Sequence, residues 1–141
     1  KHDPLHLAGF QAVHALNELV DKGGSHRVAG MSMYIVFCTF PDRDKAREAG
    51  MDLVGAQLAA CVNLLPAVES IYRWQGAVET ASEVLAVFKT SVLTYPAFEK
   101  RLRELHPYDV PEIVAVRPEE VSADYLNWVS SVSTPLGNEP K

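Results

Sequence analysis

Hydrophobic residues first form an unbroken run at residues 33–40, MYIVFCTF, which is rich in β-branched and aromatic side chains. Its length and composition predict a strand covered on both faces. Pro41 and Asp42 follow, and a proline and an acid in a first turn favour the start of a helix. Apolar positions at helical spacing extend this helix to about residue 60. Its apolar stripe consists of Ala46, Ala49, Leu53, Val54 and Leu58.

Two longer strand-like stretches come next, CVNLLPAVESIYRW and AVETASEVLAVFKTS, joined around Gln75–Gly76. Glycine at this joint predicts a hairpin turn. Pro66 has no N–H to donate, so it indicates a bend or a free edge in the first arm. The hairpin is longer than one compact sheet requires, and spare strand length with open edges predicts pairing with another chain.

The second half of the domain alternates again between helix and strand. A helix is expected over 94–106, with Thr94 as its N-cap, and the segment HPYDVP ends it. EIVAV, residues 112–116, predicts the last strand, and Ser122 precedes a closing amphipathic helix. The order is strand, helix, strand, strand, helix, strand. It predicts an α+β fold, the ferredoxin-like β-α-β-β-α-β sandwich, with helices on one face, a long bent hairpin and an added C-terminal helix.

The chain divides into three parts by composition. Residues 1–30 hold four of the five histidines and are expected to form a leader or extension with a short helix. A proline between the first two of these histidines disfavours a helical metal chelate there. Residues 31–133 form the predicted domain, and residues 134–141 form a polar tail.

Charge and composition exclude several classes of function. A net charge of −5 over 141 residues argues against a nucleic-acid partner, which requires a basic face. No apolar run is long enough to cross a bilayer. Two cysteines, Cys38 and Cys61, are too few for a disulfide framework and favour a reduced, cytoplasmic setting. No phosphate loop, nucleophile elbow or HExxH motif occurs, so we expect no enzymatic activity.

Five segments in order resemble the CutA divalent-cation-tolerance family. They lie between residues 34 and 129 and read FCTFPD, LAACVNLLPAVESIYRWQG, SEVLAVFKT, LHPYDVPEIVAV and YLNWV. The resemblance implies a homotrimer of ferredoxin-like subunits that is similar in architecture to the PII-type signalling trimers. It also implies a role in tolerance of copper and other divalent metal ions.

The same resemblance implies Cys38 and His106 as metal ligands, in the C-T-x-P-D and H-P-Y elements. From the residues alone, Cys38 is equally a small buried hydrophobe and His106 a group that caps a helix end. The family pattern sometimes has two successive histidines, whereas Leu105 stands before His106 here. One thiolate and one imidazole suit copper better than zinc, which normally takes four ligands.

Other residues offer weaker candidates for chemistry. Cys61 is expected to pack rather than to bind metal, because its neighbours are apolar. Glu79 and Glu83 suit either a solvated strand or oxygen ligands in a cleft between subunits. Asp109 or Glu112 would complete a cysteine–histidine triad, but their spacing is not diagnostic.

An alternative function is a PII-like regulatory trimer that binds a small effector between subunits and signals to an unknown protein partner. The contents of the cleft between subunits distinguish the two functions. Convergence of Cys38 and His106 would favour metal, whereas basic side chains such as Lys89 or Arg117 in that cleft would favour an anionic effector.

Overall fold

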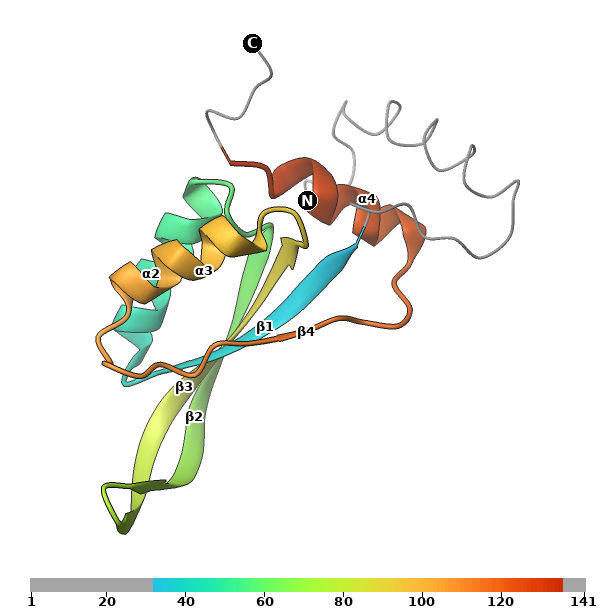
Figure 1. Ribbon diagram of the computed structural model, residues 1–141. Coiled ribbons are helices and arrows are strands. Elements are labelled where there is room, and N and C mark those ends of the chain that lie inside the picture. Colours follow the sequence, from blue (N-terminus) through green and yellow to red (C-terminus); the bar gives the residue numbers. More distant parts are fainter. Residues whose placement is uncertain (1–31, 136–141) are drawn as a thin grey trace.

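A computed structural model describes residues 32–135 of the chain. The predicted leader, 1–30, and the end of the predicted tail, 136–141, lie outside the described residues. The elements, in the expected order, are β1 (Met33–Phe40), α2 (Arg43–Gly55), β2 (Cys61–Trp74), β3 (Ala77–Ser91), α3 (Tyr95–Leu105), β4 (Val114–Val116) and α4 (Ala123–Val132) (Figure 1). Across residues 32–135, no helix combines the length and the apolar character needed to cross a membrane.

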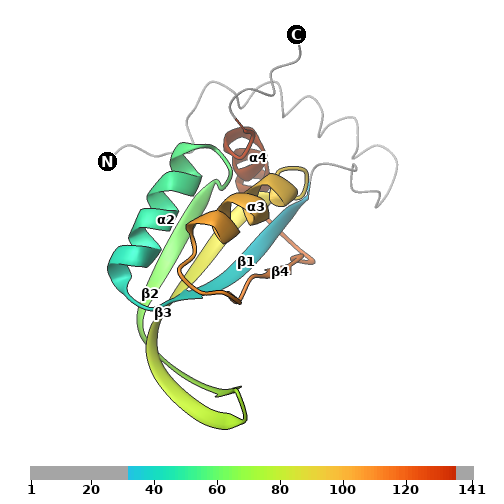
Figure 2. The same cartoon turned by 60° about the vertical axis from the view of Figure 1, so that its left-hand side comes forward.

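The four strands form one sheet in the order β2-β3-β1-β4, and every neighbouring pair is antiparallel. Helices α2 and α3 lie side by side over one face of this sheet (Figure 2). This confirms the predicted α+β, ferredoxin-like arrangement. Helix α2 ends at Gly55, earlier than expected, and β4 is limited to three residues.

Side chains that alternate along β1 divide the core between two faces. Val36 and Phe40 are fully buried on the face that α2 and α3 cover. Met33 and Ile35 point to the other face and pack in a second cluster with Val129 of α4. The expectation of helices on one face therefore holds for α2 and α3, whereas α4 contacts the opposite face at one end of the sheet.

The hairpin has the turn and the bend that its sequence predicts. Trp74 pairs with Ala77, and the two residues between them, Gln75 and Gly76, have φ of 49° and 81°. Positive φ at both central residues is the geometry of a type I′ turn, which matches the twist of the strands. The register of β2 on β3 shifts between Leu65 and Val68, around Pro66, as the proline indicates.

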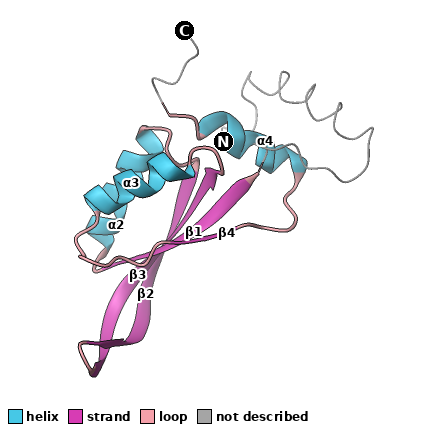
Figure 3. Ribbon diagram, in the orientation of Figure 1, coloured by secondary structure: helices cyan, strands magenta, loops and turns pink. Residues whose placement is uncertain are grey.

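Half of the hairpin extends beyond the rest of the sheet. Strand β1 pairs with β3 from Ser91 only as far as Val84, so residues 68–83 form a two-stranded segment, which we call the projecting ribbon (Figure 3). Its large apolar side chains near the tip are exposed, among them Ile71 at 68% and Val78 at 64%. A two-stranded ribbon buries too little surface to be stable alone.

Close packing of α2 on β2 predicts opposite effects of two glycine substitutions. A Cβ at buried Gly50 would lie 2.9 Å from Val62 Cγ1, whereas a Cβ at Gly55 would meet nothing within 4 Å. Because valine is stiff at χ1, Gly50→Ala should lower the free energy of unfolding by about 1–3 kcal/mol. Gly55→Ala should leave it unchanged or raise it by up to about 1 kcal/mol. Urea unfolding at equal chain concentration measures both, and equal stability of the two variants would contradict the packing.

Candidate functional site

The two predicted metal ligands meet at one backbone carbonyl. Cys38 and Thr39 lie near the end of β1, and His106 follows the last residue of α3. His106 Nε2–H donates a hydrogen bond of 2.8 Å to the Thr39 carbonyl oxygen. The Cys38 thiol donates to the same carbonyl oxygen, with 3.9 Å between Sγ and the oxygen. The fold thus brings together residues that are 68 positions apart in the sequence.

Both ring nitrogens of His106 are engaged in hydrogen bonds. Nδ1 accepts from the backbone N–H of Tyr108 at 3.1 Å, while Nε2–H donates to Thr39. The ring also stacks on Phe40, with 4.6 Å between centroids. Burial lowers the pKa of His106, partly offset by the Thr39 carbonyl and by the charge of Glu83. The imidazole is therefore neutral, and in this arrangement it has no free lone pair for a metal ion.

Cys38 is fully buried, and its thiol is hard to ionise. Burial, followed by the charges of Glu112 and Glu83, raises the pKa of Cys38 to about 12. Thiolate rather than thiol binds metal, so an ion must displace this proton. Within residues 32–135, no three His, Cys, Asp or Glu side chains are placed to hold one metal ion. The pair is not a preformed metal site, and metal binding by Cys38 and His106 stays a prediction.

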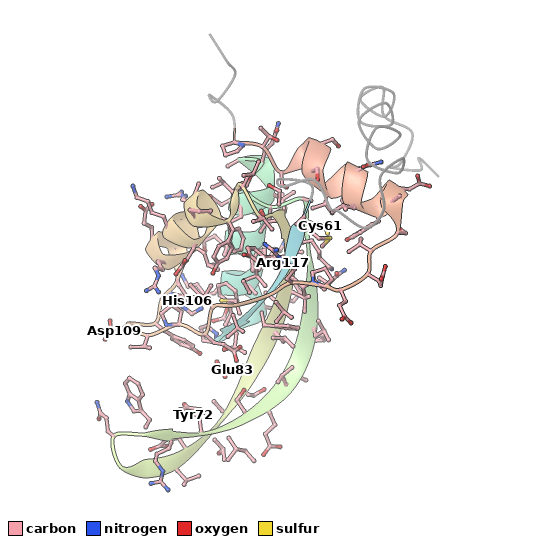
Figure 4. The ribbon with its side chains drawn as sticks, turned by 45° about the vertical axis from the view of Figure 1, so that its right-hand side comes forward. Cys61, Tyr72, Glu83, His106, Asp109 and Arg117 are labelled. Carbon is pink, nitrogen blue, oxygen red and sulfur yellow. The ribbon has the colours of Figure 1, made fainter. Side chains whose placement is uncertain are left out.

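A cleft of about 700 Å³ opens beside this pair, between the projecting ribbon and the loop that follows α3 (Figure 4). We call it the ribbon cleft. Figure 4 shows Tyr72 on the ribbon, Asp109 on the facing loop and Glu83 between them. The residues that line the cleft are Thr39, Ser70, Ile71, Tyr72, Trp74, Glu83, Pro107, Tyr108, Asp109, Val110 and Glu112.

Glu83 and Tyr108 form a contact that the sequence analysis did not identify. Glu83 is only 8% exposed, and its Oε2 accepts a hydrogen bond of 2.8 Å from the Tyr108 hydroxyl. Burial, together with this bond and the charge of Glu83, raises the pKa of Tyr108. The sequence offered Glu83 as either a solvated strand residue or an oxygen ligand. It did not indicate Tyr108 as a partner, because the two residues are 25 positions apart and no local pattern links them.

The ribbon cleft carries acidic groups and none of the expected basic ones. Lys89 donates a hydrogen bond to Asn63, and the Arg117 guanidinium lies 5.6 Å from the ring centroid of Tyr34. Arg117 directly follows β4, and Figure 4 places it away from Glu83 and Tyr72, toward the other end of the sheet. The described chain therefore gives no support to an anionic effector in this cleft.

The remaining candidates lie outside the ribbon cleft. Cys61 is partly buried with its sulfur 3.5 Å from the Tyr125 hydroxyl, which agrees with a packing role. Glu79 is exposed on the ribbon, where it pairs with Tyr72 across the two strands. Neither residue contributes a donor to the pair formed by Cys38 and His106.

Comparison with known proteins gives consistent matches. The profile of the family described as CutA1 divalent ion tolerance protein matches residues 34–132. The chain is 41% identical over 115 residues to protein CutA of Mus musculus, covering 82% of this chain and 64% of that protein. It is 44% identical over 95 residues to the divalent-cation tolerance protein CutA of Thermus thermophilus, covering 67% of this chain and 92% of that protein.

Solved structures agree with the sequence matches. The divalent cation tolerance protein (Cut A1) of Thermus thermophilus superposes with a TM-score of 0.71 at 41% identity, over 72% of this chain and 99% of that one. CutA from Xylella fastidiosa superposes with a TM-score of 0.71 at 39% identity, over 73% of this chain and 99% of that one.

Acidification should destabilise the fold through His106. Burial lowers the pKa of this imidazole in the folded chain. Below about pH 6.5 the unfolded chain therefore binds more protons than the folded chain, and the free energy of unfolding decreases as the pH is lowered. His106→Gln keeps an N–H for the Thr39 carbonyl but removes the titration. Between about pH 7 and about pH 5, the parent should lose more stability than this variant. Urea unfolding measures the free energy of unfolding of both chains at each pH. Both chains carry the same histidines in residues 1–30, so the difference between them reports on His106. Parallel pH profiles would contradict the assignment.

Proposed function

We propose that this chain, which belongs to the CutA1 divalent ion tolerance family, acts in the response to divalent metal ions as a homotrimer that binds copper. The observation that carries the copper assignment is the meeting of Cys38 and His106 at the Thr39 carbonyl oxygen. A thiol, an imidazole and a carbonyl at one point are a donor set with a preference for soft metal ions. We place the protein in the cytoplasm, in keeping with its two free cysteines.

The open strands of the sheet support an assembly of several copies. Strands β2 and β4 are its two edges, and the projecting ribbon extends the β2 edge with exposed apolar side chains. Two different open edges on one subunit favour head-to-tail pairing, which closes into a ring when the rotation permits. The number three rests on the family resemblance and is part of the proposal.

Copper binding at this pair requires a local rearrangement. His106 must release one of its two hydrogen bonds, and the Cys38 thiol must lose its proton. Copper(I) accepts two or three soft ligands, whereas zinc seeks four, so the pair favours copper. Loss of the thiol proton makes the affinity rise with pH, by about tenfold per pH unit below the pKa of the thiol.

A competitive copper(I) titration under anaerobic conditions tests this assignment. The parent should bind copper in preference to zinc, with an affinity that rises from about pH 6 to about pH 8. Cys38→Ala, which leaves an apolar side chain in the buried position, should lower the affinity by at least about tenfold and remove the pH dependence. His106→Ala should cost less, because it removes the neutral donor.

The matched control is Cys61→Ala, which removes the other thiol and should leave copper affinity unchanged. All of these chains retain the histidines of residues 1–30, so differences between them report on the pair. If Cys38→Ala binds copper as the parent does, with the same pH dependence, the site lies elsewhere and the assignment is wrong.

A further inference from the structure

A buried group of hydroxyls joins the C-terminal end of α4 to the end of β3. Ser133 directly follows α4 as its C-cap. Ser91 is the last residue of β3, and Thr94 precedes the first residue of α3. All three residues are buried, and we call them the hydroxyl node. The node shares no residue with the Cys38–His106 pair or with the ribbon cleft.

Every polar group of Ser133 has a partner. Its Oγ accepts a hydrogen bond of 2.9 Å from the Ser91 N–H and donates one of 2.7 Å to the Val129 carbonyl. Its N–H donates to the same carbonyl at 3.0 Å, and its own carbonyl accepts from the Thr94 hydroxyl. The Ser91 hydroxyl donates to Thr94 Oγ1 at 2.7 Å. A buried network with all its members satisfied fixes one arrangement of the elements that supply them.

The node lies where the pairing of β2 with β3 has ended. The last residues that these strands pair at this end are Cys61 and Lys89, two positions before Ser91. A buried backbone N–H without an acceptor is costly, and the side chain of Ser133 supplies that acceptor for Ser91. Displacement of α4 would break this bond together with the bond from Thr94.

The apolar contacts of α4 are fewer than those of the other two helices. Val129 packs with Met33 and Ala60 in a cluster of three buried residues, whereas the core under α2 and α3 has twelve. Residues 117–122, which join β4 to α4, form no regular secondary structure. An element with a small apolar contact and an irregular connection opens more readily than the core of a fold.

We infer that α4 opens as a separate unit on the sheet and that the hydroxyl node holds it closed. In the closed position α4 covers Met33 and Ala60, at the end of the sheet where β1 and β2 begin. Opening would expose these apolar residues beside the free edge of β2, so the node controls how much apolar surface this end of the subunit presents. The inference requires neither copper binding nor a particular number of copies.

Hydrogen exchange followed by mass spectrometry tests the separate opening. Exchange is measured on the intact chain, in its native assembly, at increasing urea concentrations below the unfolding transition. Amides of residues 126–133 should exchange at least about tenfold faster than those of residues 84–90. Urea should accelerate them less, because opening of α4 exposes less surface than unfolding of the domain. Equal rates with equal urea dependence, which include the case of a second copy that holds α4 closed, would overturn the inference.

Two alanine variants then test whether the node holds α4. Ser133→Ala removes the acceptor of the Ser91 N–H and should accelerate exchange in residues 126–133 at least about tenfold. Ser130→Ala is the matched control, because it makes the same change in the same segment at a buried hydroxyl that has no hydrogen-bond partner in the described chain. It should not accelerate exchange. Equal acceleration by both variants, or none by Ser133→Ala, would overturn the inference.

Thr94→Val provides a second variant if Ser133→Ala does not fold. It keeps the shape of the side chain and removes the hydroxyl that donates to the Ser133 carbonyl. Because the Thr94 side chain makes no hydrogen bond that caps α3, exchange should accelerate in residues 126–133 and stay unchanged in residues 98–105. Exchange in residues 126–133 that does not accelerate, with or without a change in α3, would overturn the inference.

Discussion

A difference in strand length between β1 and β3 determines most of the features of this chain. Strand β3 has fifteen residues and β1 has eight, so β1 covers only the half of β3 that ends at Val84. Beyond this point β3 pairs with β2 alone, which creates the projecting ribbon. The ribbon leaves apolar side chains exposed that a single subunit cannot bury, and this is the physical argument for assembly.

The candidate site lies where the two strands part. Phe40, the last residue of β1, pairs with Val84 of β3. Glu83, which precedes Val84 in the chain, is the first residue of β3 that β1 leaves unpaired. The His106 ring stacks on Phe40 and donates a hydrogen bond to the Thr39 carbonyl. It also accepts a hydrogen bond from the Tyr108 N–H, which fixes the start of the loop after α3. One side of this junction is a closed, neutral packing contact, and the other is an open, acidic cleft. The copper proposal concerns the closed side, where Cys38 and His106 meet at the Thr39 carbonyl.

Local patterns in the sequence predicted the parts of the fold that depend on local chemistry. The glycine at Gln75–Gly76 and the proline at position 66 predicted the turn and the bend, because each restricts its own backbone. Helical periodicity predicted α2, α3 and α4. It did not predict the face that α4 covers, since an amphipathic stripe does not identify its partner. The predicted ends of α2 and β4 also extended too far, because tertiary contacts decide where such elements end.

The site was predicted only in part for the same reason. Resemblance selected Cys38 and His106, and the fold brings both to one carbonyl. Their protonation and bonding depend on burial and on partners that sequence spacing does not reveal. The contact of Glu83 with Tyr108 joins two elements through side chains alone, so periodicity carries no sign of it.

The mass of the purified chain in solution tests the central claim most directly, because the projecting ribbon needs another copy to bury it. Light scattering coupled to size exclusion, at micromolar concentration, should give about three times the 15.5 kDa of one chain. A mass of one chain at that concentration would contradict the account, since the exposed ribbon would then be stable without a partner.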